Sequence, residues 1–334
     1  MATVDLVPGM ITTRAALRAS FGGSNQGGIV PIVDAKMVLV FSDPAAGAQH
    51  GYTFDGQVED DEQGPLYLYT GAGSTGNQQL SGMNGALLRH AEMGRTVHLF
   101  VADGYVPGTG TVRQRYIGQV IVDTEQPYEE RWSTSNSDTQ RLLYVFRFRP
   151  APGSRLALTG AELLQPAPDT TVLEVPVPDA PQAAGTTSTA VTTEQHTTDE
   201  TTANISGGPI TVRRREGLLT TAFEARLEQA GHVFHRHQIT VQGEPGSLMT
   251  DVYDATDNVL YEAKGRSRRS DVRMAIGQLL DYRRHIDVPP GLRLAVLLPE
   301  EPSADVRSLL ATENIHLVVR SGEGFEGFPL AATP

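Results

Sequence analysis

Short apolar runs separated by glycine-rich and polar turns fill the first 150 residues of the chain. Runs of this length at regular spacing are typical of β-strands in a barrel or a strongly bent sheet. A short helical pattern at 84–90 is expected to pack against them. The runs predicted to be strands are residues 36–42, 66–69, 96–100, 116–122 and 142–148. The pattern therefore predicts a mixed, β-barrel-like domain over residues 8–150.

A segment of different composition follows, from residue 151 to residue 208. Pro, Thr, Ala and Ser dominate from Pro166 to Gly208, which contains no aromatic residue and few large apolar residues outside 172–177. Such a stretch cannot bury enough apolar surface to offset the entropy lost on ordering. We therefore predict a flexible linker over 151–208 that lets the flanking domains move independently.

Helical and strand patterns alternate from residue 209 to residue 334. Apolar residues recur at helical spacing over 216–227 and over 270–282. Alternation through 260–264 predicts a strand, joined by a turn to the apolar segment 249–254. Continuous apolar runs predict two further, buried strands at 292–298 and 315–319. The order of helices and strands predicts an α/β domain.

The hairpin of this domain carries charged residues. Strand alternation places Glu262 and Lys264 on one face, and Asp251 lies on the preceding apolar segment. If Asp251 points the same way, two carboxylates and an ammonium group converge at a sheet edge. Carboxylates hold hard cations such as Mg²⁺, and a lysine can offset charge on a phosphate. The pattern indicates phosphodiester hydrolysis; the alternative is a solvated, charged hairpin.

At these residues the chain resembles the PD-(D/E)XK nuclease superfamily, in which an acid on one strand is followed by (D/E)-x-K on the next. Gln278, with Tyr282 four residues later, matches a pattern on the following helix in several branches. The resemblance covers about residues 211–322. It implies that Asp251 and Glu262 bind Mg²⁺, for which Mn²⁺ can substitute, that Lys264 positions the attacking water and that Gln278 orients the site.

The superfamily resemblance also concerns the helix before the hairpin. An acid on this helix often assists the metal in the superfamily. Glu216 is the first choice for this role in the present chain and Glu224 the second.

The formal net charge of −12 argues at first against a nucleic-acid partner, but half of it lies in residues 150–210. Basic residues of the C-terminal region are clustered directly after the proposed catalytic strand. Side chains of this kind supply contacts to phosphates. The expected DNA-binding residues here are Arg266, Arg268, Arg269 and Arg273. The alternative is a solvated basic loop.

Polar clusters in the N-terminal region also fit DNA recognition. Aromatic residues beside an acid or an amide can form a pocket that stacks a base and reads its Watson–Crick edge. The alternative is ordinary turn glycines and core tyrosines. The candidate DNA-binding residues are Asn25, Gln26, Tyr52, Asp55, Tyr67, Tyr69 and Asn84.

These clusters resemble the SRA-like or PUA-like reader domains of modification-dependent restriction endonucleases. The string Tyr52-x-x-Asp55-Gly56 is similar to the Tyr-Asp-Gly signature of SRA domains, with two residues inserted. The resemblance covers about residues 17–149. It implies recognition of a modified base, with 5-methyl- or 5-hydroxymethylcytosine favoured and methyladenine, phosphorothioate or an unmodified sequence as alternatives.

Other features set limits on location and on metal chemistry. The chain has no cysteine, so it has neither disulfides nor cysteine-bound zinc, and we expect a cytoplasmic protein. No apolar run approaches the ~18 residues that span a bilayer, and the N-terminus lacks a signal-peptide pattern. His235 and His237 could share a strand face near His232, but with no third ligand nearby a polar strand edge is favoured.

Together these patterns predict a modification-dependent endonuclease that acts on double-stranded DNA. Cutting both strands requires two active sites, so we expect a homodimer at least on DNA. A conventional restriction endonuclease that reads an unmodified sequence remains an alternative. So do a non-catalytic DNA-binding protein with a nuclease-like fold and an RNA or repair nuclease that recognises structure.

Overall fold

The computed structural model describes residues 5–47, 52–61, 64–134, 140–167, 169–176 and 209–330. The chain forms two compact units. The N-terminal unit comprises Met1–Asp169 with Val241–Gly246, and the C-terminal unit comprises Thr170–Thr240 with Ser247–Pro334. No described helix is long and apolar enough to cross a membrane.

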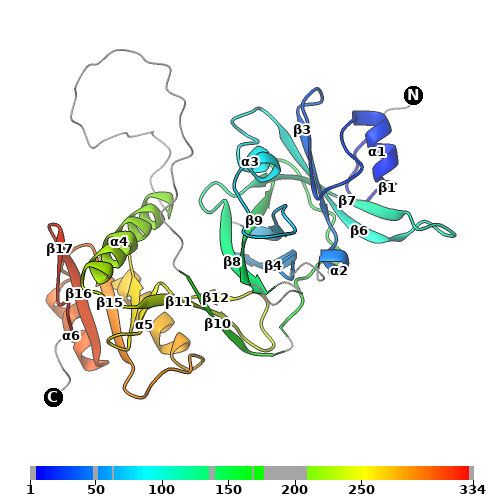
Figure 1. The fold of residues 1–334 in the computed structure, drawn as a ribbon. Coiled ribbons are helices and arrows are strands. Elements are labelled where there is room, and N and C mark those ends of the chain that lie inside the picture. The colour runs from blue at the N-terminus through cyan, green and yellow to red at the C-terminus, as the bar shows by residue number, and fades with distance from the viewer. Residues whose placement is uncertain are drawn as a thin grey trace, which may run out of the picture. The chain divides into compact units, whose positions relative to one another are not determined.

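The N-terminal unit is built on a sheet of nine strands. The strands are β1 (Ile11–Thr13), β2 (Ile29–Ile32), β3 (Met37–Ser42), β4 (Gly56–Asp61), β5 (Gly64–Thr70), β6 (Thr96–Tyr105), β7 (Val112–Val122), β8 (Tyr128–Thr134) and β9 (Gln140–Pro150). They run in the order β2-β3-β6-β7-β9-β5-β4, with β1 on β7 and β8 on β9 (Figure 1). The described helices of this unit are α1 (Arg14–Phe21), α2 (Pro44–Gly47) and α3 (Gly82–Leu88).

The predicted strands of the N-terminal unit are all present, as β3, β5, β6, β7 and β9. β3 and β6 are parallel whereas β6 and β7 are antiparallel, so the sheet is mixed as predicted. Successive side chains of β5 point to opposite faces of the sheet and enter two different hydrophobic clusters. Leu66 and Leu68 pack with Phe54, whereas Tyr67 and Tyr69 pack in a larger cluster that includes Phe146. The sheet is therefore buried on both faces at β5.

The N-terminal unit extends past the predicted boundary at residue 150. The backbone N–H of Leu164 donates to Gln57 at 2.8 Å, and that of Gln57 donates to Glu162 at 2.7 Å. Gly56 permits this approach: its φ is 155°, and a Cβ there would lie 2.8 Å from the backbone N of Leu164. The start of the predicted linker thus belongs to the N-terminal unit, because Leu164 packs in the hydrophobic cluster that contains Phe54 and Leu66.

The C-terminal unit contains a second mixed sheet, of eight strands. The strands are β10 (Thr171–Val175), β11 (Phe234–Thr240), β12 (Leu248–Met249), β13 (Val252–Asp254), β14 (Val259–Ala263), β15 (Arg293–Leu298), β16 (Ile315–Ser321) and β17 (Gly324–Glu326). They run in the order β10-β11-β13-β14-β15-β16-β17, with β12 on β11. The helices are α4 (Pro209–Gln229), α5 (Arg269–Tyr282) and α6 (Ala304–Thr312). β13 and β14 form the predicted antiparallel hairpin, and β14, β15 and β16 are parallel.

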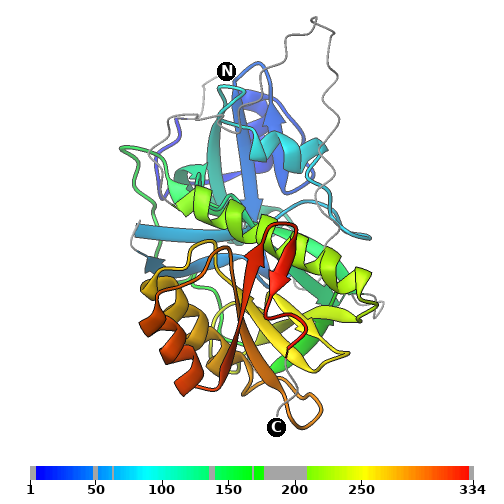
Figure 2. The same ribbon diagram turned by 90° about the vertical axis from the view of Figure 1, so that its left-hand side faces the viewer.

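Helices cover the two faces of this sheet (Figure 1, Figure 2). α4 contributes Phe223 and two leucines to a core with Tyr261 and Ala263 of β14. Glu262 alternates with these strand residues and so faces the other way. Tyr282 of α5 lies on that side, close enough for Glu262 to raise its pKa, although burial is the larger cause. The end of β14 therefore lies between α4 and α5.

β10 is a strand within the segment that was predicted to be a flexible linker. It pairs antiparallel with β11 from Thr171 opposite Thr240 to Val175 opposite Arg236. Val175 is buried at 1% exposure, because β10 pairs along the edge of the sheet at β11. Residues 177–208 of the predicted linker lie outside the described residues.

Candidate functional site

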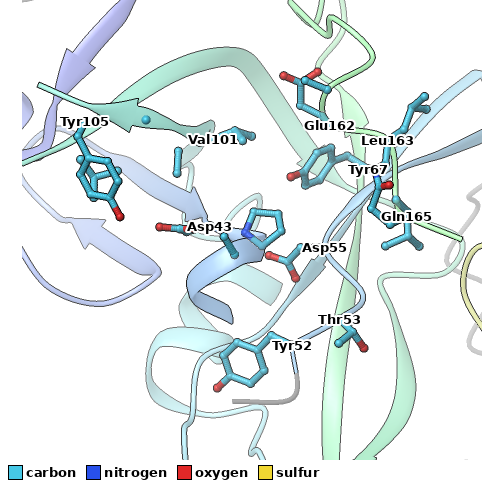
Figure 3. Close-up of a pocket in the computed structure, with 17 residues that line it drawn as sticks. Asp43, Tyr52, Thr53, Asp55, Tyr67, Val101, Tyr105, Glu162, Leu163 and Gln165 are labelled. Carbon is cyan, nitrogen blue, oxygen red and sulfur yellow. The ribbon is translucent and has the colours of Figure 1, made fainter. Parts of the chain in front are cut away.

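A cavity of about 500 Å³ lies in the N-terminal unit (Figure 3). Its wall is formed by the segment after β3, the middle of β5, the second half of β6 and the chain around Glu162. Tyr52, Asp55 and Tyr67, three of the predicted DNA-binding residues, line it. The structure therefore brings these three together, in a space of the size that holds small ligands.

Asp55 is fixed in this cavity by β3 and β5. Its Oδ1 accepts the backbone N–H of Thr70 at 2.7 Å, and its Oδ2 accepts the Ser42 hydroxyl at 2.9 Å. The hydroxyl of Tyr67 donates to the same Ser42 oxygen at 3.0 Å. Burial raises the pKa of Asp55 to about 6, against the opposing effect of these hydrogen bonds. A carboxyl group held in this way can accept from, or when protonated donate to, a polar group in the cavity.

Tyr52 lies at the rim of the cavity, where its hydroxyl donates to the carbonyl of Gly73. The guanidinium of Arg141 lies 5.7 Å from the centre of the Tyr52 ring and also donates to Gly73. Asn25 and Gln26 lie on an exposed loop that does not line the cavity. Arg14 fixes this loop by donating to the carbonyl of Gly27 at 2.6 Å.

Two other predicted DNA-binding residues, Tyr69 and Asn84, are buried and take part in packing and in a turn. Tyr69 is 3% exposed and stacks on Phe148 with ring centres 5.6 Å apart. Asn84, also 3% exposed, donates to the carbonyl of Ala72 and accepts its N–H, at 2.9 and 2.7 Å. In this structure Tyr69 and Asn84 are buried and do not line the cavity, and their contact with a base stays a prediction. Asn84 instead fixes the turn that follows β5.

Three polar residues at the cavity were not identified from the sequence: Glu162 lines it, and Ser42 and Thr70 are the hydrogen-bond partners of Asp55. Ser42 ends a predicted strand, and Thr70 stands in a string that sequence analysis noted only for its aromatic neighbours. Glu162, assigned to the linker, is buried and forms an ion pair with Arg115 of β7. No local pattern marks Glu162, because its partner lies in a strand far away in the sequence.

The C-terminal unit brings together the three residues predicted to carry catalysis. Lys264 Nζ donates to Glu262 Oε1 at 2.6 Å. Asp251, between β12 and β13, accepts the backbone N–H of Ala263 on Oδ2 at 2.8 Å. Glu262 and Lys264 are buried at 2% and 6% exposure. The prediction that Glu262 and Lys264 share a face is therefore confirmed, and the hydrogen bond to Ala263 brings Asp251 to the same strand.

The charges at this cluster influence one another strongly. Burial, and then the neighbouring charge of Asp251, raise the pKa of Glu262 well above its ordinary value. Burial works to lower the pKa of Lys264, but the charges of Glu262 and Asp251 outweigh it and raise the pKa. Lys264 is thus an ammonium group at neutral pH. The chain has only one other lysine, Lys36, among its 27 basic residues.

The two candidate acids of α4 have different hydrogen-bond partners. Glu216 Oε1 accepts the backbone N–H of Gly265 at 3.2 Å, and its charge acts on both Glu262 and Lys264. Glu224 accepts from Arg236 at 3.3 Å. Burial raises the pKa of Glu224, with Arg236 opposing. The position beside the end of β14 favours Glu216 over Glu224.

Gln278 and Tyr282 lie at the α5 side of the cluster. Gln278 Nε2 donates to the Tyr282 hydroxyl at 3.1 Å, while Gln278 Oε1 is buried with no hydrogen-bond partner among the described residues. The predicted phosphate-binding arginines follow β14: Arg266 is partly exposed, and Arg268, Arg269 and Arg273 are exposed. Arg269 is engaged in an ion pair with Asp305.

The donor atoms of the cluster suit a hard divalent cation. Glu262 Oε2 is buried and has no hydrogen-bond partner within the described parts of the chain, and a buried carboxylate oxygen without a donor is costly. A cation bound through carboxylate oxygens would satisfy it. The ligand atoms of Glu216, Asp251 and Glu262 do not all approach within 4.8 Å of one another in the structure described. Lys264 instead offers its charge to Glu262.

Residues 8–161 match the protein family described as "ScoMcrA-like, SRA domain". The N-terminal unit therefore contains an SRA domain of the ScoMcrA-like type, a domain found in modification-dependent restriction proteins. The match runs past residue 150, in agreement with the course of the chain described above. A comparison with curated proteins found no match.

Parts of several solved structures are similar to this chain. One is the "sulfur binding domain and SRA domain of ScoMcrA complexed with phosphorothioated DNA", with 22% identity over 44% of this chain and 40% of that chain and a TM-score of 0.33. Another is the "DNA modification-dependent restriction endonuclease AspBHI", with 14% identity over 44% and 76% and a TM-score of 0.32. A third is the SRA domain of SUVH5 with fully methylated CG DNA, with 18% identity over 47% and 97% and a TM-score of 0.30. The chain spans two fifths of the first of these.

Proposed function

We propose that this protein is a modification-dependent DNA endonuclease. The N-terminal unit binds a modified base of double-stranded DNA, and the C-terminal unit hydrolyses phosphodiester bonds with Mg²⁺. The first half of the proposal is supported by the SRA match over residues 8–161 together with the cavity around Asp55. The second half is supported by the cluster of Asp251, Glu262 and Lys264.

The cavity of the N-terminal unit offers a pocket for a base that is turned out of the duplex. A carboxylate can accept a hydrogen bond from the exocyclic amine of cytosine, and Asp55 is held in the cavity with lone pairs to spare. Cytosine methylated or hydroxymethylated at carbon 5 is the favoured ligand. Val101 and Leu164, which also line the cavity, supply apolar surface for the added group.

In the C-terminal unit, Asp251 and Glu262 would hold Mg²⁺, or Mn²⁺ in its place, with help from Glu216. The ion would supply charge that stabilises the attacking and leaving oxygens of the phosphodiester. Lys264 remains protonated, because its pKa is raised. It therefore donates to the attacking water or to the phosphate and does not act as a base. Gln278 fixes the orientation of Tyr282 on the α5 side.

One observation carries the catalytic part of the proposal. A lysine, which is rare in this chain, is buried against Glu262, while the second oxygen of that carboxylate has no hydrogen-bond partner among the described residues. Buried charges of this kind cost free energy unless they are paired. Their concentration at the end of β14 is typical of a functional site. The proposed partner is double-stranded DNA, cut by a homodimer that supplies two such sites.

One experiment tests recognition of the modified base and cleavage of the DNA separately. The full chain is incubated with Mg²⁺ or Mn²⁺ and matched plasmids that are unmodified or carry 5-methylcytosine, 5-hydroxymethylcytosine, methyladenine or phosphorothioate. Lys264→Ala should abolish cleavage while binding in Ca²⁺ persists. Asp55→Ala should remove the preference for modified DNA. Lys36→Asn, which removes the chain's other lysine, is the matched control and should cut as the native protein does.

The alternatives give different results in the same experiment. Equal cleavage of all plasmids would identify a conventional nuclease. Binding of modified DNA with no cleavage under any condition would identify a non-catalytic reader. Cleavage that survives Lys264→Ala would refute the assigned site.

A further inference from the structure

A second cluster of metal-binding side chains lies in the C-terminal unit, on strands β10 and β11. His235 and His237 are two residues apart on β11 and point to the same face. Glu174 on β10 is directly opposite His237 in the antiparallel register. One ligand atom from each of the three side chains lies within 4.8 Å of the other two. The sequence suggested no third ligand near these histidines, because Glu174 is distant along the chain and was assigned to the linker.

One nitrogen of each imidazole ring is buried without a hydrogen-bond partner among the described residues. His237 is 2% exposed, and its Nδ1 is buried without a hydrogen-bond partner in the described structure. The same is true of Nε2 of His235, which lies 3.9 Å from Oε2 of Glu174. An unpaired buried ring nitrogen is unfavourable. Two of them beside one carboxylate require a common partner.

The surroundings hold the rings in place. The ring centres of His235 and His237 are 4.8 Å apart, and Tyr253 packs against both, at 5.1 and 5.0 Å. The hydroxyl of Tyr253 is directed away, to Asn258 Oδ1 at 2.9 Å. Burial lowers the pKa of His237 to about 4, which leaves a neutral imidazole. Glu174 is 74% exposed in its side chain, so one side of the cluster is open to solvent.

We propose that Glu174, His235 and His237 form a binding site for a divalent transition-metal ion of the Zn²⁺ class. Two imidazoles and one carboxylate with an open fourth position are a common donor set for such ions. Donor atoms around a tetrahedral zinc ion lie roughly 3.3 Å apart, as follows from bonds of about 2.0–2.1 Å. The ligand atoms now lie within 4.8 Å of one another, and the Glu174 side chain is exposed and free to rotate towards the histidines. The bound ion would fasten the edge strand β10 to β11.

A neighbouring cluster with similar residue types does not fit a metal as well. His232 Nδ1 lies 2.7 Å from Oδ2 of Asp254, while Oδ1 of Asp254 accepts the backbone N–H groups of Thr256 and Asp257. Its donors and acceptors are therefore engaged in a turn. The proposal for Glu174, His235 and His237 is independent of the proposed nuclease function, because no residue is shared.

The test measures binding of Zn²⁺ to the full, untagged chain after removal of metal with a chelator, by calorimetry and by elemental analysis after dialysis. We expect one ion on this site, and with Co²⁺ the visible absorption of a four-coordinate ion. Glu174→Gln, a surface change that leaves the fold intact, should weaken binding about tenfold or more. His235→Gln should do the same, whereas His285→Gln, the matched histidine control, should not.

The cluster of Asp251, Glu262 and Lys264 could also bind zinc, so its carboxylates are neutralised in a separate variant. The double variant Asp251→Asn, Glu262→Gln should keep the ion that Glu174→Gln loses. Binding that is lost in this double variant and unchanged in Glu174→Gln would overturn the proposal. So would the absence of bound zinc in the native chain, and so would equal weakening by His285→Gln.

Discussion

The carboxyl group of Asp55 should make the N-terminal unit less stable as the pH rises. Burial raises its pKa to about 6 in the folded protein, against an ordinary value of about 3.9. The folded state therefore binds the proton more tightly than the unfolded state does. This contribution to stability is complete below the unfolded pKa and is lost as the pH rises through the folded pKa. A difference of about 2 pKa units corresponds to ~3 kcal/mol, of which about 2 kcal/mol falls between pH 4.5 and 8.

Asp55→Asn isolates this effect from all other titrations. The amide oxygen can still accept from Thr70, and the amide nitrogen can donate to Ser42, so the hydrogen bonds survive the change. The free energy of unfolding of the variant, minus that of the native chain, should increase by about 2 kcal/mol from pH 4.5 to pH 8.

The assay can be confined to the N-terminal unit because the chain has one tryptophan, Trp132 on β8, which is 8% exposed. Urea unfolding followed by its fluorescence reports on this unit. Asp103→Asn, on β6 and outside the hydrogen-bond network of Asp55, gives the baseline for removing a carboxylate. A difference between Asp55→Asn and the native chain that does not vary with pH would refute the reasoning, because Asp55 would then titrate normally.

Three other variants test packing and the catalytic cluster. Gly56→Ala should destabilise the N-terminal unit by more than ~2 kcal/mol in the Trp132 assay, since its Cβ would collide with the backbone of Leu164. Phe223→Ala should cost the C-terminal unit about 3–5 kcal/mol in thermal unfolding followed by circular dichroism, because the ring is fully buried. Glu262→Gln combined with Lys264→Met should abolish cleavage. It should leave thermal stability unchanged or raise it by ~1–4 kcal/mol, because a buried ion pair is replaced by neutral groups. A large loss of thermal stability would contradict this expectation.

The features that sequence predicted well depend on local periodicity. The hairpin of β13 and β14 followed from alternation and a turn, and the shared face of Glu262 and Lys264 followed from their spacing of two residues. In the N-terminal unit, alternation identified the strands but not which end of a strand reaches a cavity. Tyr67 and Tyr69 point to the same face of β5, yet only Tyr67 lines the cavity, since the neighbouring Phe148 covers Tyr69.

The features that sequence missed depend on pairing between distant segments. The segment around Glu162 and the strand β10 were both assigned to the linker, because neither has enough apolar residues to form a core of its own. Each becomes ordered by completing the edge of a structure that already exists: Glu162 beside β4, and β10 beside β11. A prediction from composition considers only the apolar surface that a segment can bury by itself. It therefore fails where a few residues are added to the edge of an existing sheet.

This failure has a consequence for function as well as for fold. Glu162 lines the cavity of the SRA domain, and Glu174 completes the cluster with His235 and His237. In both places an acidic residue of the predicted linker lies beside basic or metal-binding groups on a strand that is distant in sequence. Within the described residues, Glu162 and Glu174 of the predicted linker therefore supply carboxylate groups to these two sites.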